Sequence, residues 1–181
     1  ERVKEKISQG KWETIGGMWV ESDCTISSAE SLARQFLYGQ MFFEKEFGMR
    51  SSVAWLPDVF GFSWILPQIM KEAGIEYFST TKLKWNEKNR LPLDLFLWRG
   101  LDGSEIVCHF FDNPLGGYNG MLNPEAILGT WENFQDKRVY DKTITTFGYG
   151  DGGGGPTDDM VEYYERLKEY PGMPKLEMAP L

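Results

Sequence analysis

The sequence is poor in the residues that build metal centres and covalent cross-links. Its 181 residues include two cysteines, Cys24 and Cys108, and one histidine, His109. Two cysteines are too few for a disulfide framework and are typical of a reducing compartment, so we expect a cytoplasmic protein. Together with a single histidine they are also too few for a self-contained structural zinc site, which needs four ligands.

The chain also lacks an excess of basic charge and any long apolar run. It has 19 Lys and Arg against 27 Asp and Glu, which gives a net charge of −8. The basic residues are scattered and form no stripe, which argues against nucleic acid as a partner. No apolar run approaches the roughly 20 residues of a membrane span, and nothing at the start is typical of a signal peptide, so we expect no membrane partner.

Aromatic side chains, in contrast, are abundant, with 7 Trp, 8 Tyr and 12 Phe. Most aromatic side chains fill cores, but exposed ones form platforms for the flat faces of sugars. Composition does not shift along the chain and no internal repeat is present, so residues 1–181 are interpreted as a single partial domain. The chain begins at Glu1 and its pattern stops without a closing element, as we expect for a piece of a longer chain.

Strand and helix patterns alternate along the sequence. Strands are predicted at 14–21, 51–56, 76–81 and 143–147, and helices at 27–48, 63–74, 123–134 and 157–170. Asp102-Gly103 predicts the turn of a hairpin between 96–100 and 105–110. The alternation indicates an α/β fold with a largely parallel sheet and helices outside it, either an open doubly wound sheet or a closed barrel.

Asp58 is the first candidate functional residue. It lies in residues 55–61, Trp-Leu-Pro-Asp-Val-Phe-Gly, where an apolar strand pattern gives way to a helix pattern. Active sites of parallel sheets gather at the strand carboxyl ends. An ordinary Pro-Asp turn is the alternative, but the aromatic neighbours and Gly61, which allows close backbone approach, favour a functional carboxylate. Trp19, Glu21 and Asp23, at the end of the first predicted strand, are further pocket candidates.

A second carboxylate, Asp151, lies in the glycine-rich loop that follows the last predicted strand. Residues Gly148 to Gly153 also satisfy the letters of the dinucleotide fingerprint G-x-G-x-x-G, so a nucleotide-binding α/β module is an alternative. Asp151, and Asp158 and Asp159 in the next helix, would repel a pyrophosphate, and no Lys or Arg nearby offsets them. Two strand-end carboxylates are instead the groups that a glycosidase uses.

Several of these segments, in this order, resemble the catalytic domain of the retaining α-mannosidases of glycoside hydrolase family 38. The similarity covers residues 16–23, 30–40, 55–61, 66–69, 82–86 and 150–157, and it is closer to the bacterial and cytosolic branch of the family. The resemblance implies an incomplete, seven-stranded parallel β/α barrel with its site at the strand carboxyl ends. This chain would be a truncated portion from the middle of that barrel.

The resemblance also implies an activity, a cofactor and three site residues. The activity is the zinc-dependent hydrolysis of terminal α-mannosides of oligosaccharides through a covalent glycosyl-enzyme intermediate. Asp58 would be the nucleophile and a zinc ligand, Phe60 would line the sugar site, and Asp151 would be the acid/base. The two carboxyl groups of a retaining enzyme stand about 5–5.5 Å apart.

The chain departs from the family pattern in its zinc ligands. The family's His-x-Asp motif and a further zinc-binding histidine are absent, and His109 matches no ligand position. We therefore expect the fragment alone neither to bind zinc tightly nor to hydrolyse mannosides. A metal-dependent polysaccharide deacetylase, from a family with a related barrel, is another alternative. Barrel edges left open by truncation can pair with another copy, which would produce a homo-oligomer.

Overall fold

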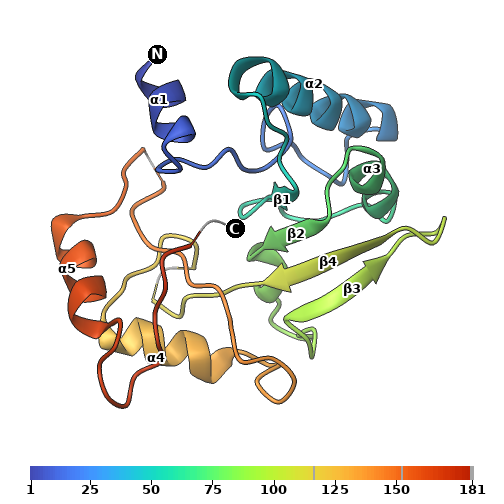
Figure 1. Ribbon diagram of the computed structural model, residues 1–181. Helices are drawn as coiled ribbons and strands as arrows, with labels where there is room; N and C mark the ends of the chain where they lie inside the picture. The colour runs from blue at the N-terminus through green and yellow to red at the C-terminus, as the bar shows by residue number, and fades with distance from the viewer. Residues whose placement is uncertain (116, 152, 180–181) are drawn as a thin grey trace. The chain divides into compact units, whose positions relative to one another are not determined.

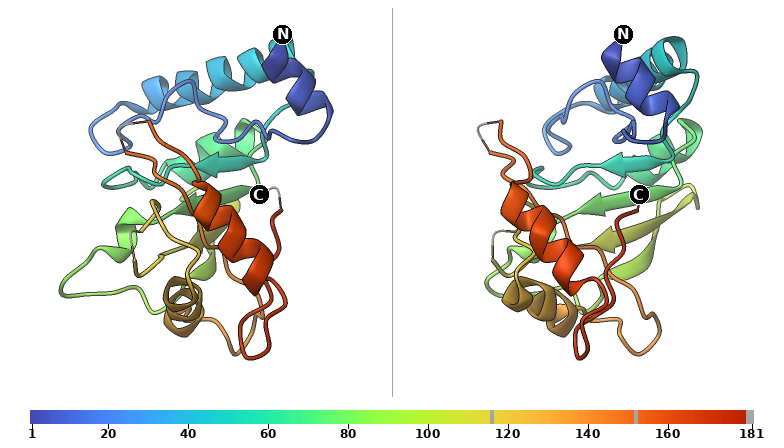
Figure 2. Two further views of the ribbon diagram at one scale, coloured as in Figure 1. Left: turned by 90° about the vertical axis from the view of Figure 1, so that its left-hand side faces the viewer. Right: turned by 60° about the vertical axis from the view of Figure 1, so that its left-hand side comes forward.

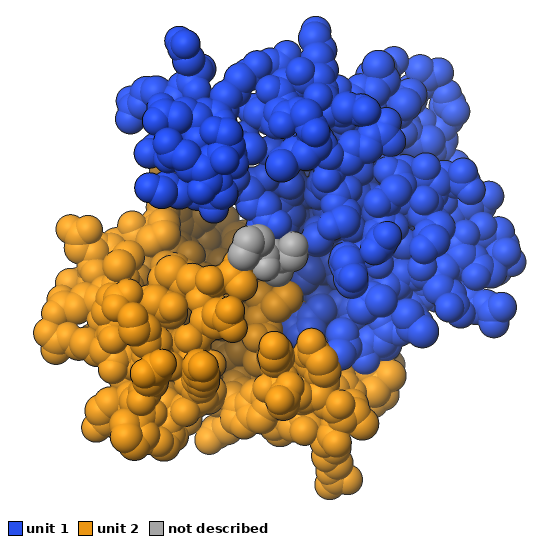
Figure 3. Space-filling model, in the orientation of Figure 1, with its two compact units in different colours: residues 1–83, 95–109, 180–181 blue, residues 84–94, 110–179 orange. Residues whose placement is uncertain are grey.

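The computed structural model describes residues 1–115, 117–151 and 153–179, which form two compact units (Figure 3). Unit 1 contains residues 1–83 and 95–109, and unit 2 contains residues 84–94 and 110–179. No helix in these ranges is long and apolar enough to cross a membrane. The helices are α1 (Arg2–Ser8), α2 (Ala29–Phe47), α3 (Leu66–Glu72), the short 3-10 helix η1 (Lys82–Lys84), α4 (Pro124–Asn133) and α5 (Asp158–Leu167).

The strands form one mixed sheet in the order β1-β2-β4-β3 (Figure 1). They are β1 (Val53–Trp55), β2 (Tyr77–Thr80), β3 (Leu95–Arg99) and β4 (Glu105–Phe110). β1 and β2 are parallel, with Ala54 opposite Phe78, and β3 and β4 form the predicted antiparallel hairpin. The expectation of an α/β fold is confirmed, whereas the truncated portion of an incomplete parallel β/α barrel stays a prediction.

Helix α2 packs closely on the chain segment that precedes it in unit 1. Leu32 and Phe36 on its inner face are fully buried. A Cβ atom at Gly39 would lie 2.2 Å from the carbonyl oxygen of Gly17, so only glycine allows this approach. The helix begins after Ser28, whose side chain accepts a hydrogen bond from the Ser31 N–H, one residue later than the predicted cap. Figures 1 and 2 show α2 beside α3 at the β1–β2 end of the sheet.

Two of the predicted strands are wrong. Residues 14–21 form no strand, because Gly16 and Gly17 have φ of 106° and 71° and turn the backbone out of the extended region. Their contact with the sheet is a hydrogen bond from the Gly16 N–H to the Val53 carbonyl. Residues 143–147 form no strand either, although they are rich in β-branched side chains. An extended segment becomes a strand only when a neighbour completes its ladder of hydrogen bonds.

Unit 2 has its own small core between α4 and α5, which lie next to each other in both views of Figure 2. The predicted helix starts are confirmed: the Asn123 side chain accepts a hydrogen bond from the Ala126 N–H, and the Thr157 side chain accepts one from the Met160 N–H. The core cluster consists of Leu122, Ile127 and Leu167, with Phe147, Tyr164, Met173 and Leu176 packed against it.

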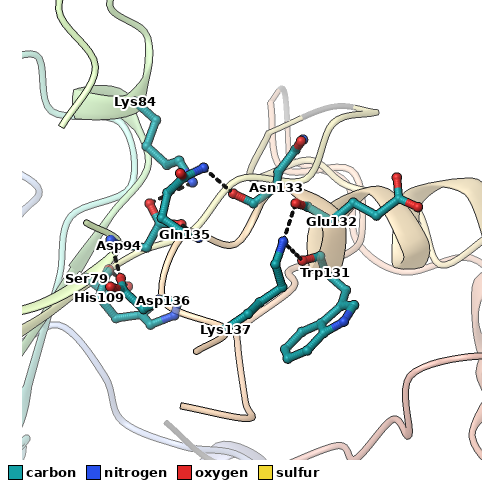
Figure 4. A network of polar contacts seen from close by, with 10 residues as sticks. All are labelled: Ser79, Lys84, Asp94, His109, Trp131, Glu132, Asn133, Gln135, Asp136 and Lys137. Carbon is teal, nitrogen blue, oxygen red and sulfur yellow. Dashed lines mark hydrogen bonds and ion pairs between the residues drawn. The ribbon is translucent and has the colours of Figure 1, made fainter. Parts of the chain in front are cut away.

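A buried polar network joins the two chain segments of unit 2 (Figure 4). Asp94 is 2% exposed, and its carboxylate pairs with Lys84 at 3.0 Å and accepts a hydrogen bond from the Gln135 N–H at 2.9 Å. Its backbone N–H donates to the Asp136 carboxylate at 2.6 Å. Because a buried carboxylate is costly unless it is paired, this network ties residues 84–94 to residues 135–136.

Both cysteines are free and buried, and burial raises the pKa of each thiol to about 12. Cys24 forms an isolated parallel bridge with Phe62, and Cys108 lies in β4. Such thiols are unreactive in the folded protein, because the thiolate is the reactive form.

Candidate functional site

Asp58 and Lys82 follow the carboxyl ends of two neighbouring parallel strands in unit 1. Asp58 comes three residues after β1, and Lys82 begins η1 two residues after β2. Because β1 and β2 run parallel, their carboxyl ends meet at the same edge of the sheet, where functional residues gather. The Lys82 Nζ lies 2.8 Å from the Asp58 Oδ1, so the edge carries an ion pair.

The Lys82 ammonium contacts Phe60 as well as Asp58. It lies 4.9 Å from the centroid of the Phe60 ring, within the range of a cation–π interaction. The Lys82 side chain is only 6% exposed, the Asp58 side chain is 44% exposed, and Phe60 is 76% exposed. One buried cation therefore holds a carboxylate and an aromatic ring that both face solvent.

The loop that carries Asp58 is fastened to residues 21–25. The Asp58 N–H donates a hydrogen bond of 2.8 Å to the Glu21 carboxylate, and the Ser63 N–H donates to the Cys24 carbonyl. Gly61 has a φ of 147°, and a Cβ atom there would lie 2.6 Å from the Thr25 hydroxyl oxygen. Glu21 thus contributes to the site as a backbone anchor for Asp58.

Asp23, the other acidic candidate near the first predicted strand, serves its own turn. Its carboxylate accepts hydrogen bonds of 2.7 Å from the N–H groups of Thr25 and Ile26. These two backbone hydrogen bonds lower the pKa of Asp23, that of Ile26 contributing most. The Asp23 carboxylate therefore stabilises its own turn, and this turn supports the Asp58 loop.

The residues of this site do not by themselves fit a zinc centre. A catalytic zinc needs about three protein ligands. Over the residues that the structure describes, no group of three or more His, Cys, Asp or Glu side chains could hold a metal ion. Asp58 could supply one carboxylate ligand, and its Oδ1 is already engaged by Lys82. His109 lies in β4, where its carbonyl oxygen accepts a hydrogen bond from the Ser79 hydroxyl (Figure 4).

Asp151 lies in unit 2, where two consecutive residues hold its carboxylate. The Tyr118 hydroxyl donates to Oδ1 at 2.9 Å, and the Asn119 Nδ2 donates to Oδ2 at 3.1 Å. The Asn119 Oδ1 also accepts from the backbone N–H groups of Gly150 and Asp151, at 2.6 and 3.2 Å. Gly152, which belongs to the same motif, lies outside the described residues.

The dinucleotide alternative loses support from the surroundings of this loop. The fingerprint needs a strand before it and a helix that opens from it, but residues 143–147 form no strand and α5 begins only at Asp158. Backbone N–H groups that would cradle a phosphate are also occupied. Those of Gly150 and Asp151 donate to Asn119, and that of Gly153 donates to the Gly150 carbonyl.

Asp112 is a carboxylate that the sequence interpretation missed. It comes two residues after β4 and belongs to unit 2. Burial raises its pKa, and the charges of Lys84 and Arg90 oppose that shift only in part. A partly buried carboxyl group with a raised pKa shares a feature of general acids, so Asp112 is a second candidate for that role.

The structure therefore brings together some of the predicted site residues. Asp58 and Phe60 meet through Lys82 in unit 1, and Asp151 has its own set of contacts in unit 2. The separation of the Asp58 and Asp151 carboxylates stays a prediction. Lys82, Tyr118 and Asn119 were missed because each acts through a contact between distant parts of the chain, which no local pattern signals.

The sequence matches a known protein family along its whole length. The model of the glycosyl hydrolases family 38 N-terminal domain matches residues 1–181. Alpha-mannosidase G of Dictyostelium discoideum is 45% identical over 99% of this chain and 16% of its own length. Alpha-mannosidase 2C1 of Homo sapiens is 43% identical over 98% of this chain and 17% of its own length.

A yeast relative and a solved structure agree with these matches. Alpha-mannosidase of Saccharomyces cerevisiae is 42% identical over 90% of this chain and 15% of its own length. The crystal structure of an alpha-mannosidase from Enterococcus faecalis superimposes with a TM-score of 0.52 and 25% identity, and the match covers 72% of this chain and 15% of that chain. The chain thus spans about a sixth of the length of the curated relatives.

Proposed function

We propose that this chain, which belongs to the N-terminal domain of glycosyl hydrolases family 38, is part of the catalytic domain of a retaining α-mannosidase. The enzyme would remove terminal α-mannosides from oligosaccharides. The observation that carries the proposal is the grouping of Asp58, Lys82 and Phe60 at the carboxyl ends of β1 and β2. Relatives named as α-mannosidases, 42% to 45% identical to the chain, support it.

The contacts of Asp58 support its proposed role as the nucleophile. Its Oδ1 is held by Lys82, and its backbone by Glu21, so the carboxylate is fixed while nearly half of the side chain stays open to solvent. In the first step a carboxylate oxygen would attack the anomeric carbon and form the covalent glycosyl-enzyme intermediate. Phe60, exposed beside it, offers an aromatic face to the sugar ring.

Asp151 is proposed as the acid/base. It would protonate the leaving glycosidic oxygen in the first step and then take a proton from the water that hydrolyses the intermediate. For retention its carboxyl group must stand about 5–5.5 Å from that of Asp58 in the full-length enzyme. The truncated parallel β/α barrel implied by the family is part of this proposal, since a barrel gathers residues from several strand ends at one face.

Zinc dependence is proposed for the full-length enzyme only. Asp58 would be one ligand, and the remaining ligands would come from outside these 181 residues, because the described residues supply no further set. We expect about one zinc per full-length protein by atomic emission spectroscopy, reduced content in Asp58→Asn, and no stable zinc in the 181-residue piece. Stoichiometric zinc in the isolated piece would contradict this assignment.

A cytoplasmic location and the deacetylase alternative are open to direct tests. We propose a cytoplasmic enzyme, from the low cysteine content, and cell fractionation with an antibody would check it.

Incubation of the full-length protein with an acetylated mannoside separates mannosidase from deacetylase activity, because a mannosidase releases mannose and a deacetylase releases acetate.

The decisive experiment traps the covalent intermediate in the full-length enzyme. A fluorinated mannosyl fluoride forms a glycosyl-enzyme that turns over slowly, and peptide mapping by mass spectrometry then locates the sugar. We expect the label on the peptide that contains Asp58, and no label in Asp58→Asn. Labelling of a different carboxylate would refute the proposed nucleophile, and release of the inverted anomer in proton NMR would refute retention.

The acid/base assignment is tested by comparing Asp151→Asn with Asp112→Asn. Loss of a general acid lowers kcat/KM, which reports the first step, by about 10²- to 10⁴-fold on substrates with a poor leaving group, while departure of an activated leaving group needs no proton. We expect Asp151→Asn to show this dependence and Asp112→Asn to lack it. The reverse pattern would move the acid/base role to Asp112.

A further inference from the structure

The glycine-rich loop that carries Asp151 needs an external support. Residues 148–155 contain six glycines, and glycine loses more conformational freedom on ordering than any other residue. Gly148 and Gly153 have φ of 111° and 81°, conformations that other residues rarely adopt. A general acid in such a loop would be poorly placed unless neighbouring side chains fixed it.

We propose that Asn119 and Tyr118 are positioning residues that aim the Asp151 carboxylate at the substrate, an inference that rests on the proposed acid/base role of Asp151. Each carboxylate oxygen accepts one hydrogen bond, Oδ1 from the Tyr118 hydroxyl at 2.9 Å and Oδ2 from the Asn119 amide at 3.1 Å. Two contacts on different oxygens restrict rotation of the carboxylate about its own axis. A single contact would leave that rotation free.

Asn119 also fixes the backbone from which Asp151 projects. Its Oδ1 accepts the N–H groups of Gly150 and Asp151, so one amide holds both the main chain and the side chain. Gly150 makes this possible, because a Cβ atom there would lie 2.5 Å from the Asn119 Oδ1. The absent side chain at residue 150 is therefore explained by the approach of Asn119.

The segment that carries the two positioning residues is itself anchored. The Gly148 N–H donates to the Gly120 carbonyl at 3.1 Å, which joins the ends of both segments. A Cβ atom at Gly120 would lie 2.4 Å from the Thr146 carbonyl oxygen, so the backbones touch directly. The Asn113 side chain, almost fully buried, donates to the Met121 carbonyl and to the Thr145 hydroxyl. The segment that carries Tyr118 and Asn119 is therefore held by Asn113 and by residues 145–148.

The experiment measures kcat/KM of the full-length enzyme on two aryl α-mannosides. Phenyl α-mannoside has a poor leaving group that needs a proton, and dinitrophenyl α-mannoside has a good one that does not. The variants are Asn119→Ala and Tyr118→Phe, and the latter removes a single hydroxyl with little risk to folding. The matched controls are Asn133→Ala and Tyr163→Phe, whose side chains are exposed on α4 and α5.

We expect both variants to lower kcat/KM for the phenyl substrate by about 10- to 100-fold, since small displacements of a reacting group have effects of that size. For the dinitrophenyl substrate the change should stay below about threefold, and the controls should change neither value. Equal losses on both substrates, or no loss on either, would overturn the inference.

Asp151→Asn, measured alongside, separates this inference from the proposed function. If Asp151→Asn shows the dependence on leaving group and the Asn119 and Tyr118 variants do not, the acid/base role stands and the positioning role is refuted. If Asp151→Asn shows no such dependence, the acid/base assignment fails and the positioning role falls with it.

Discussion

Removal of the Asp58 carboxylate should destabilise the protein more than its conversion to an amide, because Lys82 is buried beneath it. Taking one partner from a fully buried ion pair costs about 3–5 kcal/mol. Here the Asp58 side chain is 44% exposed while that of Lys82 is 6% exposed. Water can therefore enter the vacated position, and we expect Asp58→Ala to cost about 1–2 kcal/mol. Asp58→Asn keeps an acceptor at Oδ1 and should cost less than about 1 kcal/mol.

The assay compares thermal unfolding midpoints of the full-length variants at one scan rate, with a chelator present so that loss of zinc does not contribute, together with Lys82→Met alone and combined with Asp58→Ala. Because methionine fills the lysine volume without a charge, the double variant should recover part of the loss. Glu165→Ala removes the carboxylate of an exposed pair with Lys168 and should change the midpoint little. An Asp58→Ala protein as stable as Asp58→Asn, or no recovery in the double variant, would refute the reasoning.

Two further variants test other parts of the structure. Gly39→Ala replaces a helix-interior glycine, which by helix propensity alone would stabilise the protein by about 1 kcal/mol. The alanine Cβ would, however, meet the Gly17 carbonyl oxygen at 2.2 Å, so overpacking should prevail and lower the unfolding midpoint. Gly155→Ala, where a Cβ has open space, should not lower it. Asp112→Asn should raise stability at neutral pH, because burial raises the pKa of Asp112 in the folded protein. The stabilising contribution of the protonated carboxyl group is fully present below its ordinary pKa of about 3.8, and it is lost as pH rises through the raised pKa of the folded protein. The gain over wild type in urea unfolding should therefore grow from pH 3 to pH 7, and a gain independent of pH would contradict this origin.

Elements with a local chemical signal were predictable from the sequence. Asn123 followed by Pro124 marks the start of α4, and Asp102-Gly103 marks the hairpin turn, because capping and turn chemistry act over a few residues. The false strands at 14–21 and 143–147 had strand-like composition but no partner to complete a ladder. Composition reports the preference of one segment, while a strand also needs a neighbour.

The candidate site was predictable only in part for the same reason. Asp58 was recognisable from its position after a strand and from the family resemblance. Its partner Lys82, and the hydrogen bond from Tyr118 to Asp151 across 33 residues, arise from the packing of distant segments. No spacing rule in a single sequence predicts such contacts. The resemblance proposed the catalytic carboxylates, and the structure shows what surrounds them.

The two buried thiols offer a way to follow local opening of unit 1. At neutral pH almost none of either cysteine is thiolate, so an alkylating reagent reacts only when its surroundings separate. Cys24 bridges to Phe62, beside the loop of Asp58, whereas Cys108 lies in β4, an interior strand of the sheet. Faster labelling at Cys24 than at Cys108 would mean that the Asp58 loop opens locally while the sheet stays closed. The two thiols therefore report separately on the opening of the Asp58 loop and on the opening of the sheet.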